Sequence, residues 1–178
     1  NTYSKGIFKL QMDTGMGKST FVKMLDPFLN EQIGKEHVIF HDVSVRCFYI
    51  NNTYSAKLSF FRDGIKKSFY KTDDGKIFKG NDISFKSKNE FAEFLNLFPE
   101  YYQQLSYSGY NVKSKILLVI DALDESFKNN ESEILSVIPD GNMLSDDIYI
   151  LITYRTDNNL DYSVRNKFNI INFTDSFI

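Results

Sequence analysis

Apolar residues fall into short continuous runs that alternate with stretches of helical spacing. The runs of strand length lie at residues 7–12, 38–50 (with a kink near Asp42), 116–120, 148–153 and 168–173. Continuous apolar runs of this length are typical of strands buried on both faces of a parallel sheet. The pattern therefore predicts a mostly parallel, five-stranded sheet.

Helical spacing fills several of the connections between these runs. The expected helices lie at residues 18–29, 55–71 and 91–105. Their aromatic stripes are expected in the core, and Pro99 is expected to end one helix and begin another. Residues 72–85 hold two turn sequences and are expected to form a hairpin or an ordered surface loop. Strands that alternate with helices predict an α/β fold with helices on both faces of the sheet.

The connection between the first strand and the first helix is rich in glycine. Glycines let successive N–H groups point into one concavity, and a helix N-terminus adds its positive dipole end, so such a loop suits a polyphosphate. Lys18 is expected to reach the β- and γ-phosphates, and Ser19 to place its hydroxyl on Mg²⁺. The predicted phosphate-binding residues are Thr14, Gly15, Met16, Gly17, Lys18, Ser19 and Thr20.

This loop departs at one position from the pattern G-x-x-x-x-G-K-[ST]. Met12 stands where the pattern has its first glycine. That position closes the strand and does not require positive φ, whereas Gly15 and Gly17 lie where the backbone bends around phosphate. The alternative is a glycine-rich connection ahead of an amphipathic helix. It explains the glycines but not Lys18 and Ser19.

A carboxylate ends the apolar run at 116–120. Asp121 is expected to face the crevice at the carboxyl ends of the strands, where open α/β sheets bind ligands. There it would hold a water ligand of Mg²⁺ and complement Ser19. Asp124 and Glu125 can orient or deprotonate an attacking water, and spacing alone does not separate the two. The alternative is that these acids cap the N-terminus of the next helix.

Arginine is rare in this chain, and one of its four arginines, Arg155, directly follows the apolar run at 148–154. The planar donors of arginine stay charged and pair with phosphate oxygens in a fixed fork. We therefore expect Arg155 to contact the γ-phosphate and to act with Asp124 and Glu125 as a catalytic residue. A surface salt bridge is the alternative.

Together, these three segments resemble the NACHT nucleotide-binding domain of the STAND signalling ATPases. The segments are the acidic-leading phosphate loop Asp13-Thr14-Gly15-Met16-Gly17-Lys18-Ser19, the signature Asp121-Ala122-Leu123-Asp124-Glu125, which is the most specific, and the sensor segment Leu151-Ile152-Thr153-Tyr154-Arg155. The resemblance covers nearly the whole chain. Met12, Tyr154 and residues 72–85 depart from it.

The resemblance implies a three-layer P-loop NTPase core, a single domain over residues 1–178 cut from a longer protein, with 72–85 as an insertion. It implies a switch that binds ATP or ADP with Mg²⁺, hydrolyses ATP slowly, and controls oligomerisation of a larger signalling or defence protein, for example against phage. The implied partners are helical, winged-helix, sensor and effector domains of the parent chain and, with ATP bound, further copies of it. The core alone is expected to act weakly.

Composition and charge bear on three other classes of function: nucleic-acid binding, membrane insertion and zinc binding. The 178 residues are 42% hydrophobic, enough for one cored domain, and a formal net charge of −2 gives no broad footprint for nucleic acid. No apolar run approaches the roughly 20 residues of a membrane span and no leader is recognised, so we expect a cytoplasmic protein without a membrane partner. Cys47, His37 and His41 have no familiar zinc spacing.

Two other functions remain open. One is a non-hydrolysing assembly module that keeps the fold and binds nucleotide, which Met12 and Tyr154 favour. The other is a nucleic-acid-associated P-loop ATPase, suggested by basic residues on one expected helix: Lys57, Arg62, Lys66, Lys67 and Lys71. A small-molecule kinase is least expected, because four arginines are too few for a lid that clamps a second phosphate substrate.

Overall fold

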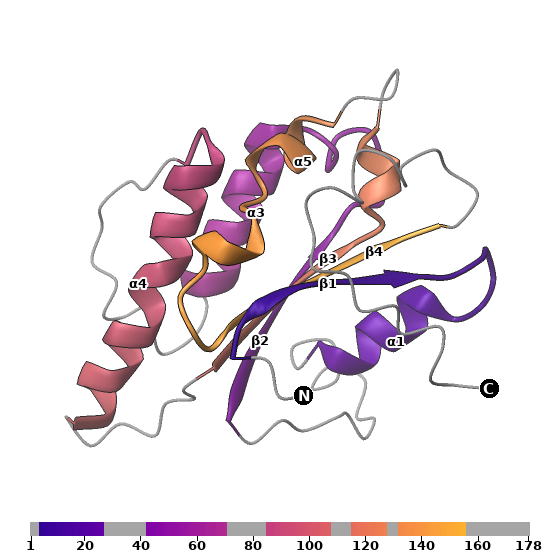
Figure 1. Ribbon diagram of the computed structural model, residues 1–178. Coiled ribbons are helices and arrows are strands. Elements are labelled where there is room, and N and C mark those ends of the chain that lie inside the picture. Colours follow the sequence, from indigo (N-terminus) through magenta and orange to yellow (C-terminus); the bar gives the residue numbers. More distant parts are fainter. Residues whose placement is uncertain (1–3, 27–41, 71–84, 108–114, 128–131, 156–178) are drawn as a thin grey trace.

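The computed structural model describes residues 4–26, 42–70, 85–107, 115–127 and 132–155. These residues form an α/β structure whose strands are β1 (Gly6–Gln11), β2 (Val43–Tyr49), β3 (Lys115–Asp121) and β4 (Ile148–Tyr154). The sheet is all parallel, in the order β1-β4-β3-β2, so the two strands that are consecutive at the start of the chain lie at opposite edges (Figure 1).

The described residues contain four strands, where the sequence predicts five. The fifth prediction falls on 168–173 and lies outside the described residues, as do residues 38–41 of the second predicted strand. The predicted insertion at 72–85 lies outside them as well, apart from Phe85. The other three predicted strands agree with β1, β3 and β4 within one or two residues at either end.

Helices cover both faces of the sheet (Figure 1). They are α1 (Lys18–Leu25), α3 (Leu58–Tyr70), α4 (Lys88–Tyr107) and α5 (Glu133–Val137), with two short 3₁₀ turns, η2 (Leu123–Ser126) and η3 (Gly141–Met143). Within the described ranges, no helix combines the length and the apolar character that a membrane span requires.

One face of the sheet packs against α1. Val22 of α1 lies in a buried cluster with Val119 of β3 and Leu151 of β4. Side chains two residues apart on a strand share a face, so Asp121 and Thr153 lie on the α1 side as well. Both polar side chains are at the carboxyl ends of their strands, beyond the apolar part of this layer.

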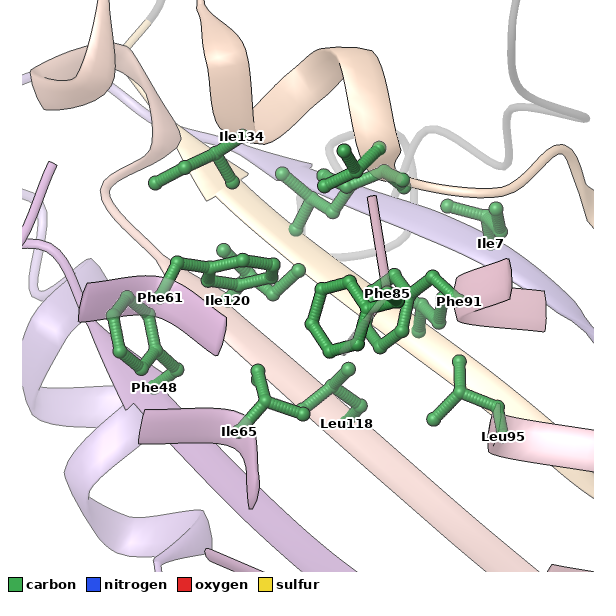
Figure 2. Close-up of a cluster of buried hydrophobic side chains, with 14 of the residues drawn as sticks. Ile7, Phe48, Phe61, Ile65, Phe85, Phe91, Leu95, Leu118, Ile120 and Ile134 are labelled. Carbon is green, nitrogen blue, oxygen red and sulfur yellow. The ribbon is translucent and has the colours of Figure 1, made fainter. Parts of the chain in front are cut away.

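The other face holds the larger core, between the sheet and α3, α4 and α5 (Figure 2). Its centre is an aromatic stack in which Phe85 and Phe91 lie with ring centroids 4.1 Å apart, and Phe61 meets both rings edge to face. Farther along, Phe69 of α3 stacks on Phe98 of α4 at 4.3 Å. The prediction that the aromatic stripes belong to the core is confirmed.

The prediction that Pro99 separates two helices is wrong, because α4 runs through it without a break. Proline deprives the Leu95 carbonyl of its helical donor, at a cost of about 3 kcal/mol. Phe91, Phe94, Leu95 and Phe98 are all 1% exposed or less. Burying four such side chains stabilises the packed helix by roughly 2 kcal/mol each, which outweighs the cost of the proline.

Candidate functional site

The connection from β1 to α1 bends at two glycines. Gly15 and Gly17 have φ of 84° and 85°, in the left-handed region that favours glycine, and Gly17 is the residue immediately before α1. A Cβ at either position would meet no other atom within 4 Å. The backbone conformation, rather than crowding, therefore calls for glycine, and the space beside the loop is open.

The loop is exposed on its outside and buried at its base. Thr14, Met16, Ser19 and Thr20 are exposed, whereas Lys18 is only 9% exposed. The cap residue of α1 is Gly17, which has no side chain with which to bind the first turn. The N–H groups of its first turn therefore keep their capacity to bind an anion, beside a cation that is nearly buried.

Hydrogen bonds join this loop to the end of β4. The Met12 N–H donates to the carbonyl of Tyr154 over 3.4 Å, and Leu10 lies beside Thr153 in the sheet register. Because β4 separates β1 from β3, the end of β1, where the loop begins, and the end of β3 are two strand spacings apart, about 10 Å. A bound phosphate and a metal ion are of a size to bridge such a distance.

Asp121 is 5% exposed and is held by a hydroxyl of the neighbouring strand. Thr153 Oγ1 donates to Asp121 Oδ1 over 2.5 Å and accepts from the Ala122 N–H over 3.0 Å. Ala122 itself has a φ of 60°, which is uncommon for a residue with a side chain. The end of β3 is thus fixed in an unusual backbone conformation around one hydroxyl.

Arg155 lies against both acidic side chains that the sequence offers as candidate bases. Its Nε donates to Asp124 Oδ2 over 2.6 Å, and its Nη2 donates to Glu125 Oε1. The Asp124 side chain is 1% exposed, whereas the Glu125 side chain is 45% exposed. Arg155 thus forms a salt bridge, which was the alternative to a phosphate contact. The bridge is not wholly at the surface, because the Asp124 side chain is buried.

One oxygen of Asp124 is left over. Asp124 Oδ1 is buried and accepts no hydrogen bond from any side chain or backbone group of the described residues. A buried carboxylate oxygen without a donor is costly, which makes it a natural acceptor for a bound water or ligand hydroxyl.

The alternative role of these acids as helix caps is not seen. The residue before η2 is Ala122, and the next helix, α5, is capped by Ser132, whose Oγ accepts from the Leu135 N–H over 3.1 Å. Asp124 and Glu125 instead turn to Arg155. Both acids lie in the first turn of η2, but their side chains bind Arg155 and do not cap that turn.

A second polar contact on the α1 side was not foreseen from the sequence. The Tyr49 hydroxyl donates to Asp26 Oδ2 over 2.8 Å and so ties the end of α1 to β2, beside Asp121 in the register. Burial raises the pKa of the Tyr49 phenol well above its usual range, and it also raises that of the Cys47 thiol on the same face. The nearby charge of Asp26 raises both pKa values further.

Residues for a magnesium ion are present, but no preformed metal cage is. Among the described residues, no three His, Cys, Asp or Glu side chains gather into a group that could hold a metal. Mg²⁺ commonly binds through one or two protein ligands together with substrate phosphates and waters. Ser19 and Asp121 fit that mode, in which the nucleotide completes the site.

The basic residues of α3 do not form an exposed cationic face. Lys67 is exposed, but Arg62 and Lys66 are half-buried, and exposed Asp63 lies between them. The exposed Lys57, just before the helix, lies over the Tyr54 ring at 5.3 Å. Lys71 and the histidines His37 and His41 lie outside the described residues.

Comparisons of the chain with protein-family models, with curated proteins and with solved structures found no match in any of the three. The class that the described residues define is an α/β protein with an all-parallel sheet and candidate ligand groups at the carboxyl ends of its strands. Its function is inferred from these groups.

Proposed function

We propose that the chain is a P-loop NTPase core that binds ATP and ADP with Mg²⁺ and works as a slowly hydrolysing switch in the cytoplasm. One observation carries the proposal: a loop bent at Gly15 and Gly17 leads into a helix whose cap residue has no side chain, on the same sheet face as buried Asp121. The glycine loop and the helix N-terminus are the features that bind phosphate, and the buried carboxylate is the feature that binds its metal ion.

Each residue has a defined part in this proposal. The loop N–H groups from Thr14 to Thr20 bind the phosphates, apart from that of Met16, which donates to the Asp13 carbonyl over 3.3 Å. Lys18 supplies a positive charge that is nearly buried and therefore acts in a low dielectric. Ser19 and Asp121 hold Mg²⁺. The chemistry that the ion would supply there is neutralisation of the charge on the phosphates.

Hydrolysis is assigned to the acids at the end of β3. Asp124 Oδ1 is the acceptor best suited to orient a water, because it is buried and lacks a donor among the described residues. Glu125 is half exposed and is the second candidate. Arg155 holds both side chains in place and is the arginine that we propose to contact the γ-phosphate.

The same arrangement favours one alternative function. Arg155 pairs with both Asp124 and Glu125. Asp124 Oδ2 and Glu125 Oε1 are thus engaged by the guanidinium and are not open to the proton of a water. The chain could therefore bind nucleotide without hydrolysing it and serve as an assembly module.

The resemblance to NACHT domains extends the proposal to partners. It suggests helical, winged-helix, sensor and effector domains in a parent chain, and an ATP-bound oligomer that activates a signalling or antiphage response. Full-length protein is the material for testing assembly, by its mass in solution with ATP and with ADP.

Titration calorimetry with ATP and with ADP, in Mg²⁺ and in EDTA, tests the binding proposal, and phosphate release tests hydrolysis. Binding with measurable turnover that Asp124→Asn or Glu125→Gln abolishes supports the switch. Binding without turnover in the full-length protein supports the assembly module. Failure of both nucleotides to bind at millimolar concentration contradicts both functions.

A further inference from the structure

Thr153 is a buried hydroxyl at the end of an otherwise apolar strand. β4 has the sequence Ile-Tyr-Ile-Leu-Ile-Thr-Tyr, and Thr153 within it is 0% exposed. A hydroxyl has one proton to donate and two lone pairs with which to accept. Here the proton goes to Asp121 Oδ1, and one lone pair accepts the Ala122 N–H.

These two bonds fix the Asp121 carboxylate at both ends of its short side chain. The bond to Oδ1 restricts rotation of the carboxylate about its own axis. The bond from the Ala122 N–H holds the backbone just after Asp121 in a left-handed conformation, at φ 60°, that is costly for a residue with a side chain. Thr153 itself is rigid at χ1 because it is β-branched.

We propose that Thr153 is a positioning residue for magnesium: it holds Asp121 in the orientation that accepts the water shell of the ion. The inference rests on the proposed nucleotide site and goes beyond it, since it assigns a role to a residue that touches neither phosphate nor metal. Groups that orient a metal-binding carboxylate commonly contribute 10- to 100-fold to metal affinity.

Thr153→Val tests the role, because valine has the same shape, favours a strand and lacks the hydroxyl. The Mg²⁺ concentration that gives half-maximal ADP binding is measured for this variant, for Thr153→Ser, which keeps the hydroxyl, and for the wild type. ADP affinity in EDTA serves as the metal-free baseline. A buried hydroxyl at the opposite ends of the strands, removed by Ser44→Ala, is the matched control.

We expect Thr153→Val to raise the Mg²⁺ midpoint about 10-fold or more, with unchanged affinity in EDTA, and Thr153→Ser to stay close to the wild type. A midpoint for Thr153→Val that equals that of the wild type overturns the inference while the nucleotide site stands. Equal losses with and without Mg²⁺ also overturn it, because they indicate a merely structural role. A wild type that binds no ADP in either condition overturns the proposed function and this inference together.

A measurement without nucleotide tests the contact itself. Urea unfolding of Thr153→Val, Asp121→Asn and the double variant reports whether the two side chains act through one bond. We expect the double variant to lose less stability than the sum of the single losses. Additive losses would contradict the contact on which the proposal stands.

Discussion

Arg155 Nε donates to Asp124 Oδ2 over 2.6 Å, and this contact joins the end of β4 to the turn after β3. Asp124 is almost inaccessible, at 1% exposure of its side chain, while that of Arg155 is 36% exposed. Removing Arg155 would leave a buried, unpaired carboxylate, whereas removing Asp124 would leave a guanidinium that water can reach. A buried carboxylate without its cation is the more costly remnant.

We therefore expect Arg155→Gln to destabilise the fold by roughly 2–3 kcal/mol, less than for a fully buried pair because water reaches the guanidinium. Glu125→Gln removes only the exposed partner and is expected to cost less than about 1 kcal/mol. Urea unfolding of both variants checks this order. Equal losses would contradict the unequal burial of the two acids.

Gly17→Ala tests the backbone of the loop. A methyl group there meets no atom, so the expected loss of about 1–2 kcal/mol comes from the left-handed conformation alone, at φ 85°. Nucleotide affinity should fall with it, as the loop relaxes. Gly141→Ala is the control, since its new Cβ would lie no closer than 3.9 Å to a neighbour and its φ is not positive, so its effect should stay within about 0.5 kcal/mol.

Gly64 of α3 packs directly against Phe48 of β2. A Cβ at this position would lie 2.3 Å from Cε2 of Phe48, which is itself buried. Gly64→Ala improves helix propensity by about 1 kcal/mol, yet we expect a net loss of about 1–2 kcal/mol because the Phe48 ring must move.

Chemical denaturation of Gly64→Ala and of Asp63→Ala, an exposed position beside it, measures this effect. The Asp63→Ala variant should be neutral or slightly stabilised. In a Gly64→Ala background, Phe48→Leu should cost less than in the wild type, since the smaller side chain relieves the clash. A stabilised Gly64→Ala protein would contradict the packing of α3 on β2.

Alkaline pH should weaken the fold through Cys47 and Tyr49. Burial, with the charge of Asp26, raises both pKa values, so the folded state keeps protons that the unfolded chain gives up near pH 9–10. The free energy of unfolding should therefore fall above about pH 9, by up to about 1.4 kcal/mol per pH unit for each group.

Urea unfolding between pH 7 and pH 10.5 measures the slope. Cys47→Ala with Tyr49→Phe should flatten it, whereas Tyr54→Phe, at an exposed tyrosine, should leave it unchanged. A slope that persists in the double variant would show that other groups carry the alkaline dependence.

Local pattern was sufficient for much of the fold and for the outline of the site. The apolar run that ends at Asp121 and the glycines before Lys18 each specify a strand end or a turn through their own chemistry, and the structure has them where the sequence predicts. The prediction of a helix end at Pro99 was wrong because burial of the aromatic stripe of α4 outweighs the low helix propensity of proline.

Partners distant in the chain could not be read from the sequence in this way. The contacts of Thr153 with Asp121 and of Tyr49 with Asp26 depend on strand order and register, which only the folded sheet supplies. A faint signal existed for Thr153, since it is the one aliphatic hydroxyl among the residues of β4. Phosphate and carboxylate oxygens are equally good acceptors for an arginine, so the sequence could not decide between them for Arg155. The structure shows that Arg155 contacts Asp124 and Glu125.

Thermal unfolding with and without saturating Mg-ATP and Mg-ADP tests the central claim most directly. The proteins are the wild type, Lys18→Ala and Lys23→Ala, the last being an exposed lysine of the same helix. At about a hundredfold the dissociation constant, a ligand adds roughly 2.7 kcal/mol, or about 5–11 °C in midpoint for a chain of this size. We predict this shift for the wild type and Lys23→Ala and its loss in Lys18→Ala. An equal shift in Lys18→Ala, or no shift in the wild type, would contradict a phosphate site at this loop.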